Sequence, residues 1–371
     1  MSPLFRTVPA IHFGWGAIEE LGPIVARWGR RALLVTGRQA LRQADITDRL
    51  LSLLSAAGVD VVPFEEVEPD PDVATCDKAR RICRKQAIEV VIGAGGGSAM
   101  DAAKVSAGLA NELPDTREYH SDRTPSAPGL PFVAVPTTSG TGAEATPNGV
   151  ISDRERGLKK SIRHPSFLAR AAVVDPELTV PLPPKVTAHC GLDAFVQAVE
   201  SYTSRQAWPL TEGISLRATQ LIAQHIRQAY EDGRNREART AMSAGSLMAG
   251  IALANARLGI VHGLAHSLGI RLGLPHGLIC GVLLPHAIEL NRDAAWEKYE
   301  ALSALIGVDV AELTRSLLQE FDMPSDFSAA GLREADFPGI VSEAMASGST
   351  KANPKEVTEE DVVEILTALA G

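Results

Sequence analysis

Short runs of β-branched and other apolar residues alternate with helical stretches through the first half of the chain. Such runs occupy residues 31–37, 59–67 and 88–97, and two shorter ones stand at residues 131–138 and 171–177. Parallel strands need crossovers, usually helical, between them, and strands covered on both faces are almost continuously apolar. The alternation therefore predicts a parallel sheet with helices on both of its faces.

The pattern changes after three prolines, Pro181, Pro183 and Pro184, which break regular structure. From there to the C-terminus the apolar residues follow helical periods, with almost no strand signal. A chain of 371 residues that is 45% hydrophobic is long enough for two domains with separate cores. We predict a Rossmann-like α/β domain over residues 1–182 and an all-helical domain over residues 183–371.

Composition and charge exclude several classes of protein. The net charge of −9 and the lack of a long basic run argue against a nucleic-acid partner. The N-terminus has no signal-peptide pattern, and no uncharged apolar run reaches the roughly 18 residues that span a membrane. We expect a cytoplasmic protein without a membrane partner. The cysteines form no C-x-x-C pair, so we interpret Cys76, Cys83, Cys190 and Cys280 as reduced, mostly structural thiols.

A glycine cluster follows the apolar run at residues 88–97. The run passes through Gly95, Gly96, Gly97 and Ser98 into a good helical sequence. Backbone N–H groups at the start of a helix bind anions, and the missing Cβ atoms allow a pyrophosphate to approach. Because Ser98 stands where the dinucleotide fingerprint has its third glycine, an ordinary tight turn remains the alternative explanation.

A second polar loop, "PTTSGTGAE" at residues 136–144, follows another apolar run. Its threonines, serine and glycines offer hydrogen-bond donors to a phosphate or a ribose. One such loop is weak evidence, since polar loops are common. Two loops at the ends of neighbouring predicted strands favour a nucleotide site.

Histidines accumulate in an apolar part of the second half, at His262, His266, His276 and His286. A buried imidazole needs a partner, because an unpaired polar group is costly in the interior. His262 and His266 are one helical turn apart, and His276 follows a Gly/Pro break that can fold a second segment back on the first. Imidazoles combined with a carboxylate suit zinc or ferrous iron.

The stretch "GLDAFVQAVESYTS" places Asp193, Gln197 and Glu200 at intervals of four and three residues in a helical pattern. Alone, this is most simply a polar helix stripe, and each histidine alone is most simply a core histidine bonded to backbone. The combination of an acid and a carbonyl on one helix with histidines near a bend on another favours a metal site.

Five motifs in register resemble the iron-containing, or group III, alcohol dehydrogenases: "GGGSAMDAAK", "PTTSGTGAEAT", "VVDPELT", "GLDAFVQAVESYTS" and "VHGLAHSLG" with the following "LPHG". The resemblance implies a dinucleotide-binding α/β domain at residues 1–182, a helical metal and substrate domain at residues 183–371, and a metal in the cleft between them.

The resemblance also implies a set of metal ligands. The family pattern has an aspartate, a histidine four residues later and two further histidines, which fall on Asp193, position 197, His262 and His276. His266 falls on a histidine near the reacting carbon that does not bind metal, and we assign it the catalytic role. Position 197 departs from the pattern, because Gln197 stands where the histidine would be. A glutamine oxygen is a weaker ligand than imidazole for zinc and is acceptable to Fe²⁺.

The implied function is an NAD(P)-dependent alcohol dehydrogenase or aldehyde reductase. It would transfer a hydride between nicotinamide and a small alcohol or aldehyde, with Fe²⁺ or Zn²⁺ polarising the substrate oxygen. Three alternatives stay open: a metal-free reductase resembling maleylacetate reductase, an enzyme of the dehydroquinate synthase or glycerol-1-phosphate dehydrogenase kind, and a non-catalytic nucleotide-binding protein.

Cofactor choice depends on one position. NAD-preferring members of the family typically carry an aspartate after the first strand, where this chain has Gly37 followed by Arg38. A missing carboxylate and a nearby guanidinium favour a 2′-phosphate, so we expect NADP rather than NAD. The predicted cofactor-binding residues are Gly37, Arg38, Gly95, Gly96, Gly97, Ser98, Asp101, Thr137, Thr138, Ser139 and Thr141.

The N-terminal segment alternates Ile11, Phe13 and Trp15, which is the pattern of an edge strand. Such a strand is able to pair with the same strand of a second subunit, and members of the resembled family form dimers in this way. We therefore expect a homodimer.

Overall fold

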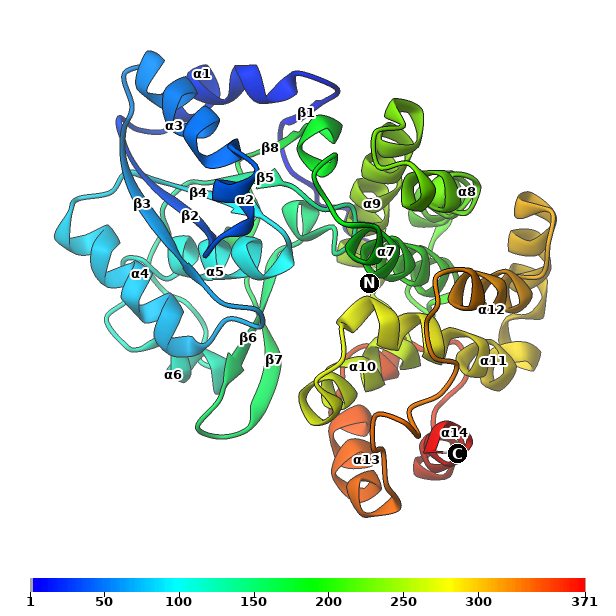
Figure 1. Ribbon diagram of the computed structural model, residues 1–371. Coiled ribbons are helices and arrows are strands. Elements are labelled where there is room, and N and C mark those ends of the chain that lie inside the picture. Colours follow the sequence, from blue (N-terminus) through cyan, green and yellow to red (C-terminus); the bar gives the residue numbers. More distant parts are fainter. Residues whose placement is uncertain (1–2, 371) are drawn as a thin grey trace. The chain divides into compact units, whose positions relative to one another are not determined.

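The computed structural model describes residues 3–370, which divide into two compact units (Figure 1). One unit is Thr7–Leu182, and the other consists of the residues up to Arg6 together with those from Pro183 onward. The first described residues belong to the helical unit: the Arg6 backbone N–H donates to Asn255 Oδ1 at 2.7 Å, and the Phe5 ring packs edge-on against Trp208. We expected residues 1–182 to form one domain, but residues 3–6 belong to the helical unit.

A parallel sheet of six strands forms the centre of the first unit. In spatial order the strands are β1 (Ile11–Phe13), β8 (Ala171–Val174), β5 (Phe132–Pro136), β4 (Val90–Gly95), β2 (Arg31–Gly37) and β3 (Asp60–Val67). Every neighbouring pair is parallel. Strands β4, β5 and β8 are buried along their whole length, which explains their continuous apolar sequences. The predicted parallel α/β fold is confirmed.

Helices cover both faces of this sheet (Figure 1). Residues of α1 and α3 form one apolar cluster with alternate residues of the strands, and α4 and α5 pack together on the opposite face. The helices are α1 (Leu21–Ala26), α2 (Ala40–Gln43), α3 (Ile46–Ala56), α4 (Val73–Lys85), α5 (Gly97–Gly108) and α6 (Thr116–His120). Short 3-10 turns occupy Ala17–Glu20, Ala143–Ala145, Pro165–Phe167 and Pro176–Thr179.

A two-stranded antiparallel hairpin, β6 (Asn148–Asp153) with β7 (Leu158–Arg163), is the element that the sequence analysis did not predict. Its second strand is mostly polar and only partly buried, so it lacks the apolar run that identified the other strands. Gly157 adopts φ +64° in the connecting turn, a conformation that favours glycine.

The second unit is helical throughout its described part, as predicted. Its helices are α7 (Pro184–Thr203), α8 (Pro209–Glu231), α9 (Arg236–Ala256), α10 (Ile260–Leu272), α11 (His276–Ile306), α12 (Val310–Glu320), α13 (Phe337–Ala346) and α14 (Glu359–Ala370), with 3-10 turns at Glu334–Asp336 and Thr350–Ala352. Helices α7 and α8 begin with proline, which suits the first turn because its N–H groups have no intrahelical acceptor.

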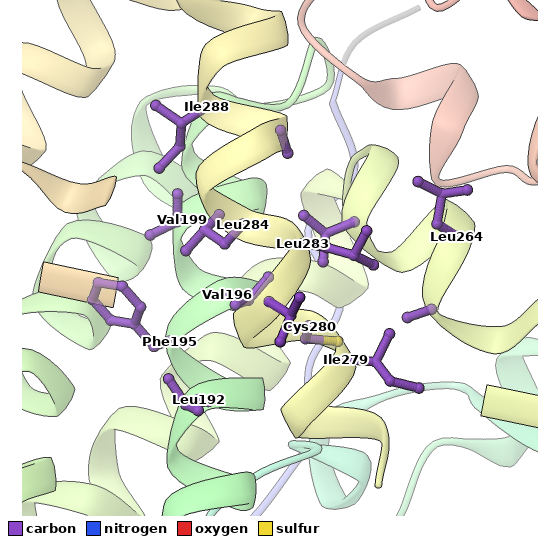
Figure 2. Packing of buried hydrophobic residues seen from close by; sticks show 14 of the residues in the cluster. Leu192, Phe195, Val196, Val199, Leu264, Ile279, Cys280, Leu283, Leu284 and Ile288 are labelled. Carbon is purple, nitrogen blue, oxygen red and sulfur yellow. The ribbon is translucent and has the colours of Figure 1, made fainter. Parts of the chain in front are cut away.

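Helix α7 is the central helix of this unit. Its apolar side chains, including Leu192 and Val196, pack against Cys280 and Leu284 of α11 (Figure 2). Because α7 is buried on nearly all sides from Gly191 to Thr203, its polar residues cannot form a solvated stripe. The polar positions of α7 therefore require partners inside the protein.

Helices α9 and α10 meet at a sharp bend of 106°. Arg257 ends α9 with φ +66°, and Gly259 precedes α10. Among residues 3–370 no single helix has the length and apolar composition of a membrane span. The bent pair α9 and α10 reaches that length and composition only when its two helices are taken together.

Candidate metal centre and nucleotide loops

Helix α7 directs two polar side chains toward one point in the interior of the helical unit. Asp193 and Gln197 lie one turn apart, and the Gln197 Nε2 donates to Asp193 Oδ1 at 2.9 Å. Both residues are about 4% exposed or less. The Gln197 Oε1 atom is buried and has no hydrogen-bond partner in the described chain. A buried oxygen without a partner is costly, so this carbonyl is available to a ligand.

His262, in the first turn of α10, lies between two carboxylates of α7. Its Nε2 is 3.3 Å from Asp193 Oδ1, and its Nδ1 is 2.6 Å from Glu200 Oε2. The other oxygen of Glu200 accepts from the backbone N–H of Val261 at 2.7 Å. One carboxylate therefore satisfies a free N–H at the start of α10 and fixes the orientation of the imidazole.

His276 begins α11 after the break at Gly273 and Pro275, as the Gly/Pro pattern predicted. Its Nε2 lies 3.8 Å from Asp193 Oδ1. The ring of His266 stacks on that of His276, with centroids 5.2 Å apart and planes 11° from parallel. The predicted catalytic histidine and all four predicted ligands, Gln197 included, thus lie close together.

Cys280 is a member of this cluster that the sequence analysis missed. Its Sγ lies 3.6 Å from His276 Nε2 and 3.8 Å from His262 Nε2, and the residue is fully buried. Cys280 is a free thiol, as expected, but the sequence analysis did not predict its two imidazole neighbours. Its position one turn after His276 on the same helix was the signal that could have found it.

Gly277 allows α11 to approach α7 closely enough for His276 to meet Asp193. A Cβ atom at this position would lie 1.8 Å from the backbone carbonyl oxygen of His189 and 3.2 Å from the Asp193 Cβ. A backbone carbonyl cannot move aside as a flexible side chain can. The absence of a side chain at residue 277 is thus a condition of the cluster.

Gly277→Ala is therefore expected to lower the free energy of unfolding by about 1–3 kcal/mol, because it overpacks the α7–α11 contact. Gly213→Ala is the matched control: Gly213 lies inside α8 with no atom near its added methyl group, so alanine should stabilise the helix by about 0.5–1 kcal/mol. Urea unfolding of both variants measures the difference. Equal stability of the two would contradict the close approach.

The side chains of the cluster shift one another's pKa values. Burial alone would raise the pKa of Asp193, but the hydrogen bond from His262 and the charge of His276 outweigh it and lower the pKa. Burial alone would lower the pKa of His262, but Cys280, Asp193 and Glu200 raise it well above the ordinary value. The imidazoles in turn lower the pKa of the Cys280 thiol against the effect of burial. The lowered pKa values favour the anionic forms of Asp193 and Cys280, and the raised pKa of His262 favours its protonated form, so the acidic and basic groups stabilise each other's charges.

The donor atoms fit a transition-metal ion. One oxygen of Asp193, one nitrogen each of His262 and His276, and the sulfur of Cys280 all lie within 4.8 Å of one another. Carboxylate, imidazole and thiolate are the usual ligands of zinc, and iron accepts the same nitrogen and oxygen donors. Together with the unpartnered Gln197 oxygen, this donor set fits a divalent metal.

The two predicted nucleotide loops touch each other in the α/β unit. Gly95 ends β4 with φ +142°, and α5 begins at Gly97. A Cβ atom on Gly97 would lie 2.7 Å from the Thr141 methyl group, and one on Gly96 would lie 3.2 Å from that of Thr138. The glycines thus let the second loop lie directly on the first, with the N-terminus of α5 at their junction.

The remaining predicted cofactor residues have different surroundings. Thr137 and Ser139 are buried, and the backbone N–H of Thr137 donates to the Gly95 carbonyl. The Ser98 hydroxyl accepts from the backbone N–H of Asp70 at 3.2 Å. Asp101 accepts from the Val150 N–H at 3.0 Å and lies 3.6 Å from the Lys104 ammonium. Asp101 therefore joins α5 to the hairpin, a structural role that the sequence did not show.

Gly37 and Arg38 stand at the carboxyl end of β2. Arg38 is exposed, and its Nε donates to the Glu66 carbonyl at 3.4 Å. The nearest atom to a Cβ built on Gly37 is the Val67 carbonyl oxygen at 3.8 Å, so a side chain fits at this position.

Comparison with known proteins identifies the class. The family described as iron-containing alcohol dehydrogenase matches residues 9–176, and the C-terminal family of Fe-containing alcohol dehydrogenases matches residues 187–370. The chain belongs to the iron-containing alcohol dehydrogenases, and it is an oxidoreductase that acts on alcohols or aldehydes. The family implies a nicotinamide cofactor and a metal.

Several individual relatives match almost end to end. The chain is 34% identical to long-chain-alcohol dehydrogenase 1 of Geobacillus thermodenitrificans, over 97% of this chain and 95% of the relative. It is 35% identical to 1,3-propanediol dehydrogenase of Citrobacter freundii, over 96% of each. A crystal structure of a 1,3-propanediol oxidoreductase superposes with a TM-score of 0.94 at 32% identity, and all of both chains is covered.

Proposed function

We propose that the chain is an NADP-dependent aldehyde reductase, reversible as an alcohol dehydrogenase, whose metal is held entirely by the helical unit. The observation that carries the proposal is the group of buried Asp193 and His262 with the partly exposed His276, whose donor atoms lie within 4.8 Å of one another. The α/β unit is the proposed dinucleotide-binding domain. Relatives named for lactaldehyde, 1,3-propanediol and long-chain alcohols support a small or aliphatic alcohol as substrate.

Asp193, His262 and His276 are the proposed principal ligands, and the Gln197 oxygen is a weaker additional donor. The metal, Fe²⁺ or Zn²⁺, supplies a Lewis acid that stabilises negative charge on the substrate oxygen. Glu200 holds the His262 ring with its Nε2 directed at the cluster. His266 is proposed to hold a proton at a ring nitrogen and pass it between the substrate or ribose hydroxyl and solvent.

The glycine loop and the threonine loop are proposed to bind the cofactor. The backbone N–H groups at the start of α5 suit the pyrophosphate, and the hydroxyls of Thr138 and Thr141 lie beside them. A nicotinamide cofactor held by these loops would supply the hydride chemistry. The protein's own contribution is to fix the cofactor's position and to exclude other orientations.

The test is NADPH oxidation by the purified protein with a panel of short and long aliphatic aldehydes. The protein is stripped of metal with a chelator and then reloaded with Fe²⁺ or Zn²⁺ without oxygen. We expect activity to be lost on stripping and regained on reloading. Full activity of the stripped protein would replace this proposal with a metal-free reductase. Inactivity under every condition would overturn the proposed cofactor and substrate class.

Gly37→Asp is expected to shift cofactor preference from NADP toward NAD by about tenfold or more. The new carboxylate would accept from the ribose 2′-hydroxyl and repel a 2′-phosphate, and the space around Gly37 admits it. The measurement is the ratio of kcat/KM for NADPH to that for NADH, in wild type and variant. An unchanged ratio would show that residue 37 does not determine the choice between NADP and NAD.

We also propose a homodimer that forms through the β1 edge of the sheet. Strand β1 pairs with β8 on one side only, and Phe13 is 40% exposed. An uncovered strand edge is able to extend the sheet into a second copy. Light scattering at micromolar concentration should give twice the 39.3 kDa mass of one chain. A monomer mass under these conditions would rule the dimer out.

A further inference from the structure

Cys280 occupies a position in the metal cluster that no sequence motif assigned to it. It stands one turn after His276 on α11, among the apolar side chains between α7 and α11 (Figure 2). Its sulfur nevertheless lies 3.6 Å from His276 Nε2 and 3.8 Å from His262 Nε2. A thiol with an apolar layer on one side and two imidazole nitrogens on the other is placed as a metal ligand would be.

The distances between the donor atoms agree with one coordination sphere. Tetrahedral bonds of about 2.0–2.1 Å to nitrogen or oxygen and about 2.3 Å to sulfur would separate oxygen from nitrogen by roughly 3.3 Å and nitrogen from sulfur by roughly 3.6 Å. The Asp193 oxygen is 3.3 Å from His262 Nε2 and 3.8 Å from His276 Nε2. The two nitrogen–sulfur distances, 3.8 and 3.6 Å, lie within about 0.2 Å of the tetrahedral value, and only the distance from Asp193 to His276 is longer by about 0.5 Å.

Gln197 does not supply an equivalent donor. Its amide nitrogen, not its oxygen, contacts the Asp193 carboxylate, at 2.9 Å. Its oxygen is a neutral ligand and bonds zinc more weakly than imidazole or thiolate. The chain therefore lacks a strong fourth donor at residue 197 and has one at residue 280.

We propose that the Cys280 thiolate is the fourth strong ligand of the metal, together with Asp193, His262 and His276. Because catalytic zinc sites are able to expand to five ligands, the substrate oxygen would bind as the fifth. This inference rests on the proposed metal-dependent function. Binding forms one sulfur–metal bond and releases the thiol proton to solvent. Because a thiolate is a soft ligand, this coordination favours zinc over ferrous iron, in contrast to the metal after which the family is described.

The test is X-ray absorption spectroscopy of the full-length protein loaded with zinc. We expect one sulfur neighbour at about 2.3 Å and nitrogen or oxygen neighbours at about 2.0–2.1 Å. Cys280→Ser should lose the sulfur neighbour and weaken zinc binding at least about tenfold, with a smaller effect on Fe²⁺. Gln197→Ala should keep the sulfur neighbour, as should the matched control Cys83→Ala, which removes a buried thiol of the other unit.

The wild-type spectrum decides the matter even if a variant does not fold. Zinc bound with nitrogen and oxygen neighbours only would overturn the role of Cys280 and leave the proposed metal-dependent function intact. A sulfur neighbour that persists in Cys280→Ser would overturn it as well. A wild-type protein that takes up no metal would overturn both this inference and the proposed function.

Discussion

His276→Ala is expected to leave less than about a tenth of the wild-type metal after gel filtration and to lower kcat/KM for aldehyde reduction by about 10³-fold. His276 supplies one of the two imidazole nitrogens within reach of Asp193, at 3.8 Å. A Lewis acid contributes several kcal/mol of stabilisation to the transition state, and each 1.36 kcal/mol is a factor of ten in rate. Elemental analysis and steady-state kinetics measure the two effects.

The control for His276→Ala is His286→Ala on the same helix. His286 is absent from the group of donors that could hold a metal, so its loss should leave the metal content at the wild-type level. The His276 side chain is 28% exposed and lies at the start of α11, so its replacement should not prevent folding. If wild type and variant both contain no metal while His276→Ala still loses activity, the histidine acts by hydrogen bonding to the oxyanion, as in a metal-free reductase.

The sequence predicted those strands and helices whose burial alone determines their residue pattern. Strands β4, β5 and β8 are buried throughout, so their apolar runs are visible without any knowledge of their neighbours. The hairpin β6–β7 was not predicted because β7 is mostly polar and the hairpin is stabilised by contacts with residues distant in the sequence. Asp101, which accepts from the β6 backbone at Val150, is such a contact, made 49 residues away.

The sequence predicted which site residues share a helix face, but it did not predict which residues of different helices are in contact. Intervals of four residues placed Asp193 with Gln197 and His262 with His266 on common faces. The structure joins the first pair by a hydrogen bond and places both histidine rings beside that of His276. No spacing relates Glu200 to His262, which are 62 residues apart and meet only through the packing of α7 against the start of α10. Cys280 was missed for a different reason: the cysteines were examined for pairing with one another, whereas its partners are histidines.

Glu200→Ala is expected to weaken zinc binding by about 10–100-fold and to lower the free energy of unfolding of the metal-free protein by about 3–5 kcal/mol. Glu200 is 5% exposed and accepts both from His262 Nδ1 and from the Val261 N–H, so its removal leaves two buried donors without an acceptor. His262 also loses one of the partners that raise its pKa, and its ring is no longer held toward the cluster.

Glu200→Gln separates these two effects. In wild type each Glu200 oxygen accepts from one donor, the Val261 N–H or the His262 Nδ1. The glutamine amide has only one oxygen, so it replaces the acceptor for one of these donors. The variant should therefore recover part of the stability lost in Glu200→Ala, while its zinc affinity stays below wild type. Zinc affinity is measured by competition with a chelator, and stability by urea unfolding without metal. Wild-type zinc affinity in Glu200→Ala would show that the orientation of His262 is set by the packing of α10 alone, and the carboxylate would then act only on the helix terminus.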